Sequence, residues 1–108
     1  MSTTESDSRG VILVLTRRVH PGREEAYEAW LQRIAAAERG ADGFLSREDI
    51  PPLPDGQDWY TSIIRFESAA KLDAWMATST CRELIAEVEP LSRDVAKSRI
   101  EAGFDGWV

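Results

Sequence analysis

The stretch VILVLTRRV, residues 11–19, decides the fold because it is apolar on both sides of a β-strand. Side chains alternate along a strand, so Leu13 and Arg17 point to one side. Ile12 and Val14 point to the other side. Neither set is typical of a water-facing surface, and we therefore expect both faces of this strand to be covered.

A helix is predicted directly after this strand. Pro21 suits a first helical turn, where its missing N–H costs nothing, and Gly40 is expected to end the helix. Between them the apolar residues recur at helical spacing on one stripe, which predicts a face buried against the sheet. The residues of this stripe are Tyr27, Trp30, Leu31, Ile34 and Ala35.

Two more strands are predicted at 43–50 and 59–67. The prolines of the intervening PPLPDGQD, 51–58, remove ladder donors, so this segment predicts a hairpin loop closed by an Asp-Gly turn. Along the second of these strands, Tyr60 and Phe66 share one face with Ser62 and Ile64.

A second helix is predicted after Ser68, which is a suitable N-cap, and it places Leu72, Trp75 and Met76 on one side. Thr80 and Glu83 fit a capping box, which predicts that the helix restarts there and runs to Pro90. A weaker strand is predicted at 95–104.

The predicted order is βαββαβ, a ferredoxin-like α+β fold with a four-stranded antiparallel sheet and two helices on one face. Two helices cover only one face of that sheet. Exposing the apolar second face would forfeit several kcal/mol at about 25 cal/mol per Å². We therefore expect a second copy of the chain as the cover, in a homodimer.

Composition excludes several classes of function. The chain has 108 residues, which predicts one domain, and a formal net charge of −6 without a basic stripe. This disfavours nucleic acids and anionic membranes as partners. Cys81 is the single cysteine and His20 the single histidine, so no metal-site spacing is present.

The polar residues 1–9 contain no apolar signal segment, and no apolar run approaches the roughly 20 residues that span a bilayer. We expect residues 1–9 to be a disordered tail, residues 10–108 to be a single domain, and the protein to be cytoplasmic.

Two quoted segments give the chain a family resemblance. VHPGREEAYEAW, from residue 19, and YTSIIRFESAAKLDAWMATSTCREL, from residue 60, resemble the antibiotic-biosynthesis monooxygenase (ABM) superfamily. The resemblance covers residues 11 to about 91, and GFDGWV at the end is a weaker match. It implies a dimeric α+β barrel, with a ligand pocket between each sheet and its helices.

The family implied by this resemblance includes haem-degrading enzymes and cofactor-independent monooxygenases. The haem branch places its proximal histidine where this chain has Ile85, and its strand asparagine near Leu15. The sequence contains no asparagine, and isoleucine cannot bind iron. Of these two branches, the resemblance therefore leaves the cofactor-independent one, which needs no cofactor and oxidises hydrophobic, polyketide-like or quinol-like aromatic compounds.

That chemistry requires aromatic walls and a group that stabilises an oxyanion. Tyr60, Arg47 and Arg17 are the candidate catalytic residues. Strand arginines flanked by carboxylates also predict ion pairs, so a pocket arginine would have to lack a carboxylate partner. The expected pocket residues are Leu15, Tyr27, Trp30, Tyr60, Phe66 and Trp75.

Two interpretations of function remain open. Trp30 and Trp75 also fit simple core packing, and His20 fits a surface turn. The polyketide branch is described with an asparagine among its working groups, and this chain has none. The alternative is therefore a non-catalytic dimer that binds a small ligand or a protein partner.

Overall fold

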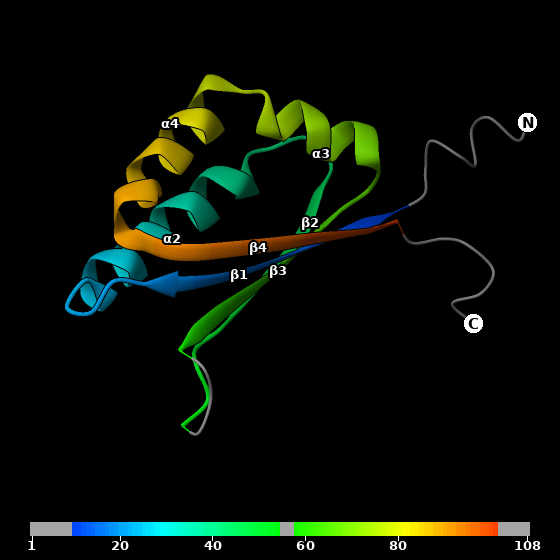
Figure 1. Ribbon diagram of the computed structural model, residues 1–108. Helices are drawn as coiled ribbons and strands as arrows, with labels where there is room; N and C mark the ends of the chain where they lie inside the picture. The colour runs from blue at the N-terminus through cyan, green and yellow to red at the C-terminus, as the bar shows by residue number, and fades with distance from the viewer. Residues whose placement is uncertain (1–9, 55–57, 102–108) are drawn as a thin grey trace, which may run out of the picture.

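The computed structural model describes residues 10–54 and 58–101. The described residues form a four-stranded antiparallel sheet with strand order β2-β3-β1-β4 and helices on one face (Figure 1). This confirms the ferredoxin-like α+β class. The elements are β1 (Val11–Val19), α2 (Glu24–Arg39), β2 (Phe44–Ile50), β3 (Trp59–Phe66), α3 (Ala69–Met76), α4 (Ser79–Val88), the 3-10 turn η1 (Glu89–Leu91) and β4 (Ser92–Glu101).

The two faces of β1 lie as the alternation predicts. Leu13 and Arg17 are buried on the face beneath the helices, whereas Ile12 and Val14 are only half-buried on the opposite face. In Figure 1 the helices lie above the sheet, and within the described residues no element covers its lower face. We call this lower face the open face. It includes Ile63 of β3, which pairs with Val14.

Helix boundaries differ from the sequence prediction at two points. Pro21 lies in the turn before α2, not in its first turn, because the helix begins only at Glu24. The N-cap of α4 is Thr78, not Thr80. Thr78 has extended backbone angles and its hydroxyl accepts a hydrogen bond from the Cys81 N–H at 3.1 Å, whereas Thr80 is already helical. The predicted cap at Ser68 is confirmed, since its hydroxyl accepts from the Lys71 N–H.

The last strand begins earlier than predicted. β4 starts at Ser92, because Ser92 pairs with Val19 and a register shift between Arg18 and Val19 lets the ladder extend to that point. Residues 1–9, the Asp55-Gly56 turn and the segment 102–108 lie outside the described residues.

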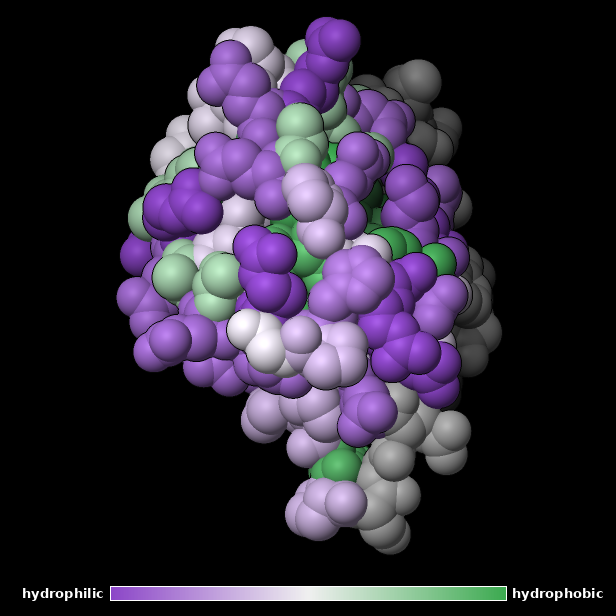
Figure 2. Space-filling model, turned by 60° about the vertical axis from the view of Figure 1, so that its left-hand side comes forward, coloured by the Kyte–Doolittle hydropathy of each residue, from purple (hydrophilic) through white to green (hydrophobic). Residues whose placement is uncertain are grey.

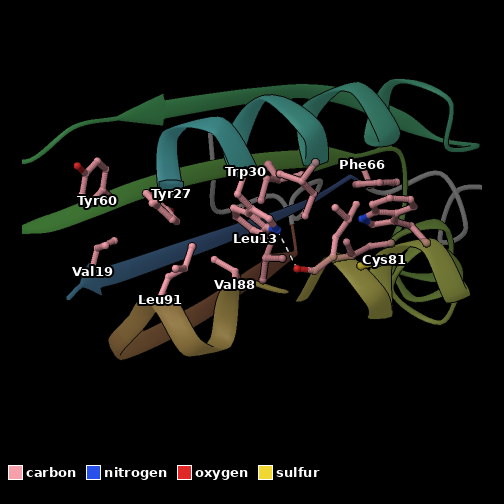
Figure 3. Close-up of a cluster of buried hydrophobic side chains, with 14 of the residues drawn as sticks. Leu13, Val19, Tyr27, Trp30, Tyr60, Phe66, Cys81, Val88 and Leu91 are labelled. Atoms are coloured by element: carbon pink, nitrogen blue, oxygen red, sulfur yellow. Dashed lines mark hydrogen bonds between the residues drawn. The ribbon is translucent and has the colours of Figure 1, made fainter. Parts of the chain in front are cut away.

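The core lies between the helices and the sheet. In Figure 3, Tyr60 and Phe66 mark opposite ends of the buried cluster, with Tyr27, Trp30 and Leu13 between them. Tyr60 and Phe66 are six positions apart on β3, which separates them by about 20 Å along the strand. Tyr60 and Phe66 therefore pack at the two ends of the core, and other residues of the sheet face the helices between them.

Candidate functional site

A cavity of about 470 Å³ lies between the sheet and the helices. This volume is within the range of pockets for small organic ligands. All four strands and all three α-helices contribute to its wall. The lining residues are Leu13, Leu15, Arg17, Tyr27, Trp30, Ile34, Glu38, Arg47, Ser62, Ile64, Leu72, Trp75, Met76, Cys81, Arg82, Ile85, Glu89, Val95 and Lys97.

The cavity is mainly apolar inside and opens beside β4. Of its lining residues, Arg82, Glu89, Val95 and Lys97 are exposed, and they lie on α4, η1 and β4. Figure 2 shows hydrophobic residues at the bottom of a hollow in the surface, surrounded by hydrophilic side chains. The cavity therefore offers apolar walls to a ligand and charged side chains at its opening.

Arg17 is the buried cation of this cavity. It is only 5% exposed, and in the described part of the chain no carboxylate lies within ion-pair distance. Its guanidinium donates to the Ser92 hydroxyl at 2.8 Å and lies over the Trp30 ring, 5.6 Å from the centroid. The Ser92 hydroxyl in turn donates to the Val88 carbonyl. These contacts fix the guanidinium without neutralising its charge.

Tyr27 lies beside Arg17 and shares its environment. Burial lowers the pKa of Arg17, against an opposing effect of the Tyr27 phenol. Burial also raises the pKa of Tyr27, against an opposing effect of the guanidinium. Tyr27 stacks on Trp30 with ring centroids 5.7 Å apart and meets Tyr60 edge to face at 4.7 Å. The phenol and guanidinium together form a polar spot on an aromatic wall.

Arg47 also lines the cavity, but each of its three guanidinium nitrogens already donates a hydrogen bond. It donates two bonds of 2.9 Å to Glu38, binds the Asp49 carboxylate through Nε, and reaches the Ser62 hydroxyl at 3.3 Å. Its side chain is 5% exposed and that of Glu38 is 3% exposed. Burial opposes the charge of Arg47, but Glu38 and Asp49 more than offset this and raise its pKa. The pair joins α2 to β2 as a buried structural link.

The two tryptophans of the cavity differ in their indole N–H groups. Trp30 donates to the Leu84 carbonyl at 2.7 Å, the dashed line in Figure 3, and this bond joins α2 to α4. Trp75 lines the cavity and makes no side-chain hydrogen bond within the described residues. Trp75 is therefore the indole that retains a free donor.

The structure brings most of the predicted site residues together. Leu15, Tyr27, Trp30, Trp75, Arg17 and Arg47 all line the cavity. Tyr60 instead borders a small pocket of about 110 Å³ together with Glu28 and Asp49, and Phe66 packs edge to face on Phe44. The predicted ion pair is found for Arg47 but not, among the described residues, for Arg17.

Several site residues were not singled out from the sequence. Glu38 had a signal, because it extends the buried stripe by one turn beyond Ile34. Ser92, Arg82 and Lys97 had none, since their roles depend on which elements meet across the cavity.

Neither the histidine nor the cysteine stands out as a reactive group. His20 is exposed in the turn before α2 and does not line the cavity. Cys81 is buried and lines the cavity, where burial raises the pKa of its thiol. In residues 10–54 and 58–101 we find no group of three His, Cys, Asp or Glu side chains arranged to hold a metal ion. Nor is any described helix long and apolar enough to cross a membrane.

Comparison with known proteins gives the fold and the family. The chain is similar to the structure of Rv0793 from Mycobacterium tuberculosis, with 24% identity over 89% of this chain and 96% of the other and a TM-score of 0.76. It is also similar to SnoaB, a cofactor-independent oxygenase from Streptomyces nogalater, with 19% identity, coverage of 89% and 95%, and a TM-score of 0.77. These likenesses establish the fold.

A sequence relative is an uncharacterized protein of Synechococcus elongatus, Synpcc7942_2318, which is 26% identical over 94 residues. The match covers 87% of this chain but only 45% of the relative's length. The family model for antibiotic biosynthesis monooxygenases matches residues 10–87. The chain therefore belongs to the antibiotic biosynthesis monooxygenase (ABM) family.

Proposed function

We propose that the protein is a cofactor-independent monooxygenase that oxidises an electron-rich hydrophobic aromatic compound of the polyketide or quinol type. The single observation that supports this best is the buried guanidinium of Arg17, which makes no ion pair among the described residues and lies on the wall of a mainly apolar cavity. An uncompensated buried charge costs several kcal/mol, so a site that keeps one is suited to a ligand that brings the opposite charge.

The chemistry begins with an ionised substrate. An anthrone or quinol that loses a proton to water before it enters the cavity becomes an oxyanion, which is electron-rich enough to pass an electron to O₂. Arg17 binds that oxyanion, and Tyr27 beside it offers a phenol O–H as a second donor. Stabilising the anion raises the fraction of substrate that is ready to react.

The remaining residues hold the ring and exclude water. Leu13, Ile64 and Leu72 give the apolar surface, and Trp75 adds an aromatic face with a free N–H. For an anthrone the overall change converts a CH₂ group and O₂ into a C=O group and water, which balances without a further reductant. The proposed active site therefore works by binding and charge stabilisation.

We further propose that the protein acts as a homodimer through its open face. On the central strands this face presents Ile12, Val14 and Ile63 where a solvated sheet normally alternates to polar residues. A second copy of the sheet supplies matching apolar surface. The proposed dimer leaves each cavity on the helix side of its own sheet.

The test is oxygen uptake with 1,8-dihydroxyanthrone and with naphthalenediols, in chelated buffer without flavin. We expect uptake well above autoxidation, a loss of about a hundredfold in Arg17→Gln, as for the removal of one oxyanion donor, and little change in Arg93→Gln. Arg93 is an exposed arginine on β4 that does not line the cavity, so it controls for the lost charge.

The non-catalytic alternative has one observation in its favour. Among the described residues that line the cavity, Glu38 is paired with Arg47 and Glu89 lies exposed at the opening, and His20 does not line the cavity, so the interior contains no free general base. Tight binding of these compounds with no uptake above autoxidation would establish the binding function in place of the oxygenase. Equal rates in Arg17→Gln and the parent protein would remove Arg17 from the mechanism.

A further inference from the structure

We propose that the ligand of this cavity carries a carboxylate, which Lys97 of β4 and Arg82 of α4 bind at the opening. The inference rests on the proposed aromatic ligand and names its chemical class more closely. The two cations lie on opposite sides of the same opening, one on the sheet edge and one on the helix that faces it.

Both cations are free in the part of the chain that the structure describes. Neither Lys97 nor Arg82 makes an ion pair or a side-chain hydrogen bond there. The chain has a formal net charge of −6, and several of its other cations are paired: Arg33 with Glu87, Lys71 with Asp42 and Arg99 with Asp73. With the two unpaired cations and the single carboxylate of Glu89, the opening has a net positive charge, whereas the chain as a whole is negative.

The charges around the cavity favour an anion. Its wall contains four cationic side chains and two anionic ones. Of the two carboxylates, Glu38 is neutralised by Arg47, whereas Glu89 makes no ion pair among the described residues and lies exposed at the opening. The exposed lining residues at the opening therefore carry two cationic side chains, Lys97 and Arg82, and one anionic one, which leaves an excess of one positive charge.

The spacing also fits a ligand with two polar ends. In the ladder, Val95 is opposite Arg17 and Lys97 is opposite Leu15, so Lys97 lies about 7 Å further along the strand. A fused-ring skeleton spans such a separation, with its oxyanion on Arg17 and its carboxylate at the opening. Arg82 adds a guanidinium fork, which matches the two oxygens of a carboxylate.

The test compares two fluorescent probes with the same ring system, the anion anthracene-2-carboxylate and the neutral anthracene-2-carboxamide, titrated at low ionic strength. We expect the acid to bind roughly tenfold more tightly than the amide, given two solvent-exposed charge contacts. The preference should shrink as salt is added. In Lys97→Gln/Arg82→Gln the preference should disappear while the affinity for the amide stays unchanged.

Arg93→Gln is the matched control, because it removes one positive charge from the same strand outside the cavity. It should keep the preference for the acid. Equal affinity of the parent protein for both probes, or an equal loss in Arg93→Gln, would overturn this inference while leaving the aromatic-ligand proposal intact. Failure of both probes to bind would overturn both proposals.

Discussion

Replacing Arg17 with methionine is expected to remove function without costing stability. Methionine keeps most of the volume and removes a charge that is 5% exposed and has no carboxylate partner among the described residues. The variant loses a charged hydrogen bond to Ser92, worth about 1.5–3 kcal/mol, and a cation–π contact with Trp30, worth about 0.5–2 kcal/mol. It regains the desolvation cost of the ion, several kcal/mol.

The net result for the ligand-free protein is a free energy of unfolding that is unchanged or higher by up to about 2 kcal/mol. Ser92 keeps its own bond to the Val88 carbonyl, so its hydroxyl still has a partner, whereas the Tyr27 phenol on the cavity wall loses the neighbouring guanidinium. Urea denaturation measures the change, and oxygen uptake measures the function.

Arg47→Met is the matched comparison, because Arg47 lines the same cavity but is paired. Its removal leaves Glu38 buried and unpartnered, and should cost about 3–5 kcal/mol. A loss of more than about 2 kcal/mol in Arg17→Met would refute our reasoning, since it would identify Arg17 as a structural residue whose charge is already satisfied in the folded chain.

Three further outcomes are expected. In Arg47→Met, burial still raises the pKa of Glu38, and the opposing charge of Arg47 is gone. Above the ordinary pKa of 4.5, the folded state therefore holds a proton that the unfolded chain has released, and the free energy of unfolding should fall as pH rises. Urea denaturation at a series of pH values tests this. Val14→Lys places a charge on the proposed dimer interface and should give a monomer in light scattering, whereas a persistent dimer would place the interface elsewhere. Thr78→Ala should lower the free energy of unfolding by about 1 kcal/mol and Thr80→Ala by much less, and the reverse order would contradict the cap assignment.

The spacing of apolar residues predicted the helices and strands of this fold well, because that spacing reflects which side of each element is buried. The alternation in 11–19 identified both faces of β1, and the stripe through Tyr27, Trp30 and Ile34 identified the buried face of α2. Cap positions were less accurate, since Thr78 and Thr80 are both chemically suitable and only the backbone conformation, extended at Thr78 and helical at Thr80, identifies the cap. The start of β4 depended on a register shift, which leaves no mark in the sequence.

The sequence predicted the residue types that form the site better than it predicted the ion-pair partner of each residue. The sequence indicated an aromatic cavity with an arginine, but it could not rank Arg17 against Arg47. That difference depends on Glu38, which lies nine positions before Arg47 and meets it only after α2 folds onto β2. Tyr60 was favoured for its chemistry, yet its place near one end of β3 directs it away from the main cavity.

The exposure of β4 has a consequence for how a ligand enters. Apart from Ser92, each residue of this strand is exposed, and within the described residues β4 is an edge strand that pairs only with β1. Its amide hydrogens should therefore exchange with solvent faster than those of β1 and β3. Because the same strand forms one wall of the opening, fraying of β4 can admit a ligand while the helices stay in place. Bound ligand should slow exchange along β4 first.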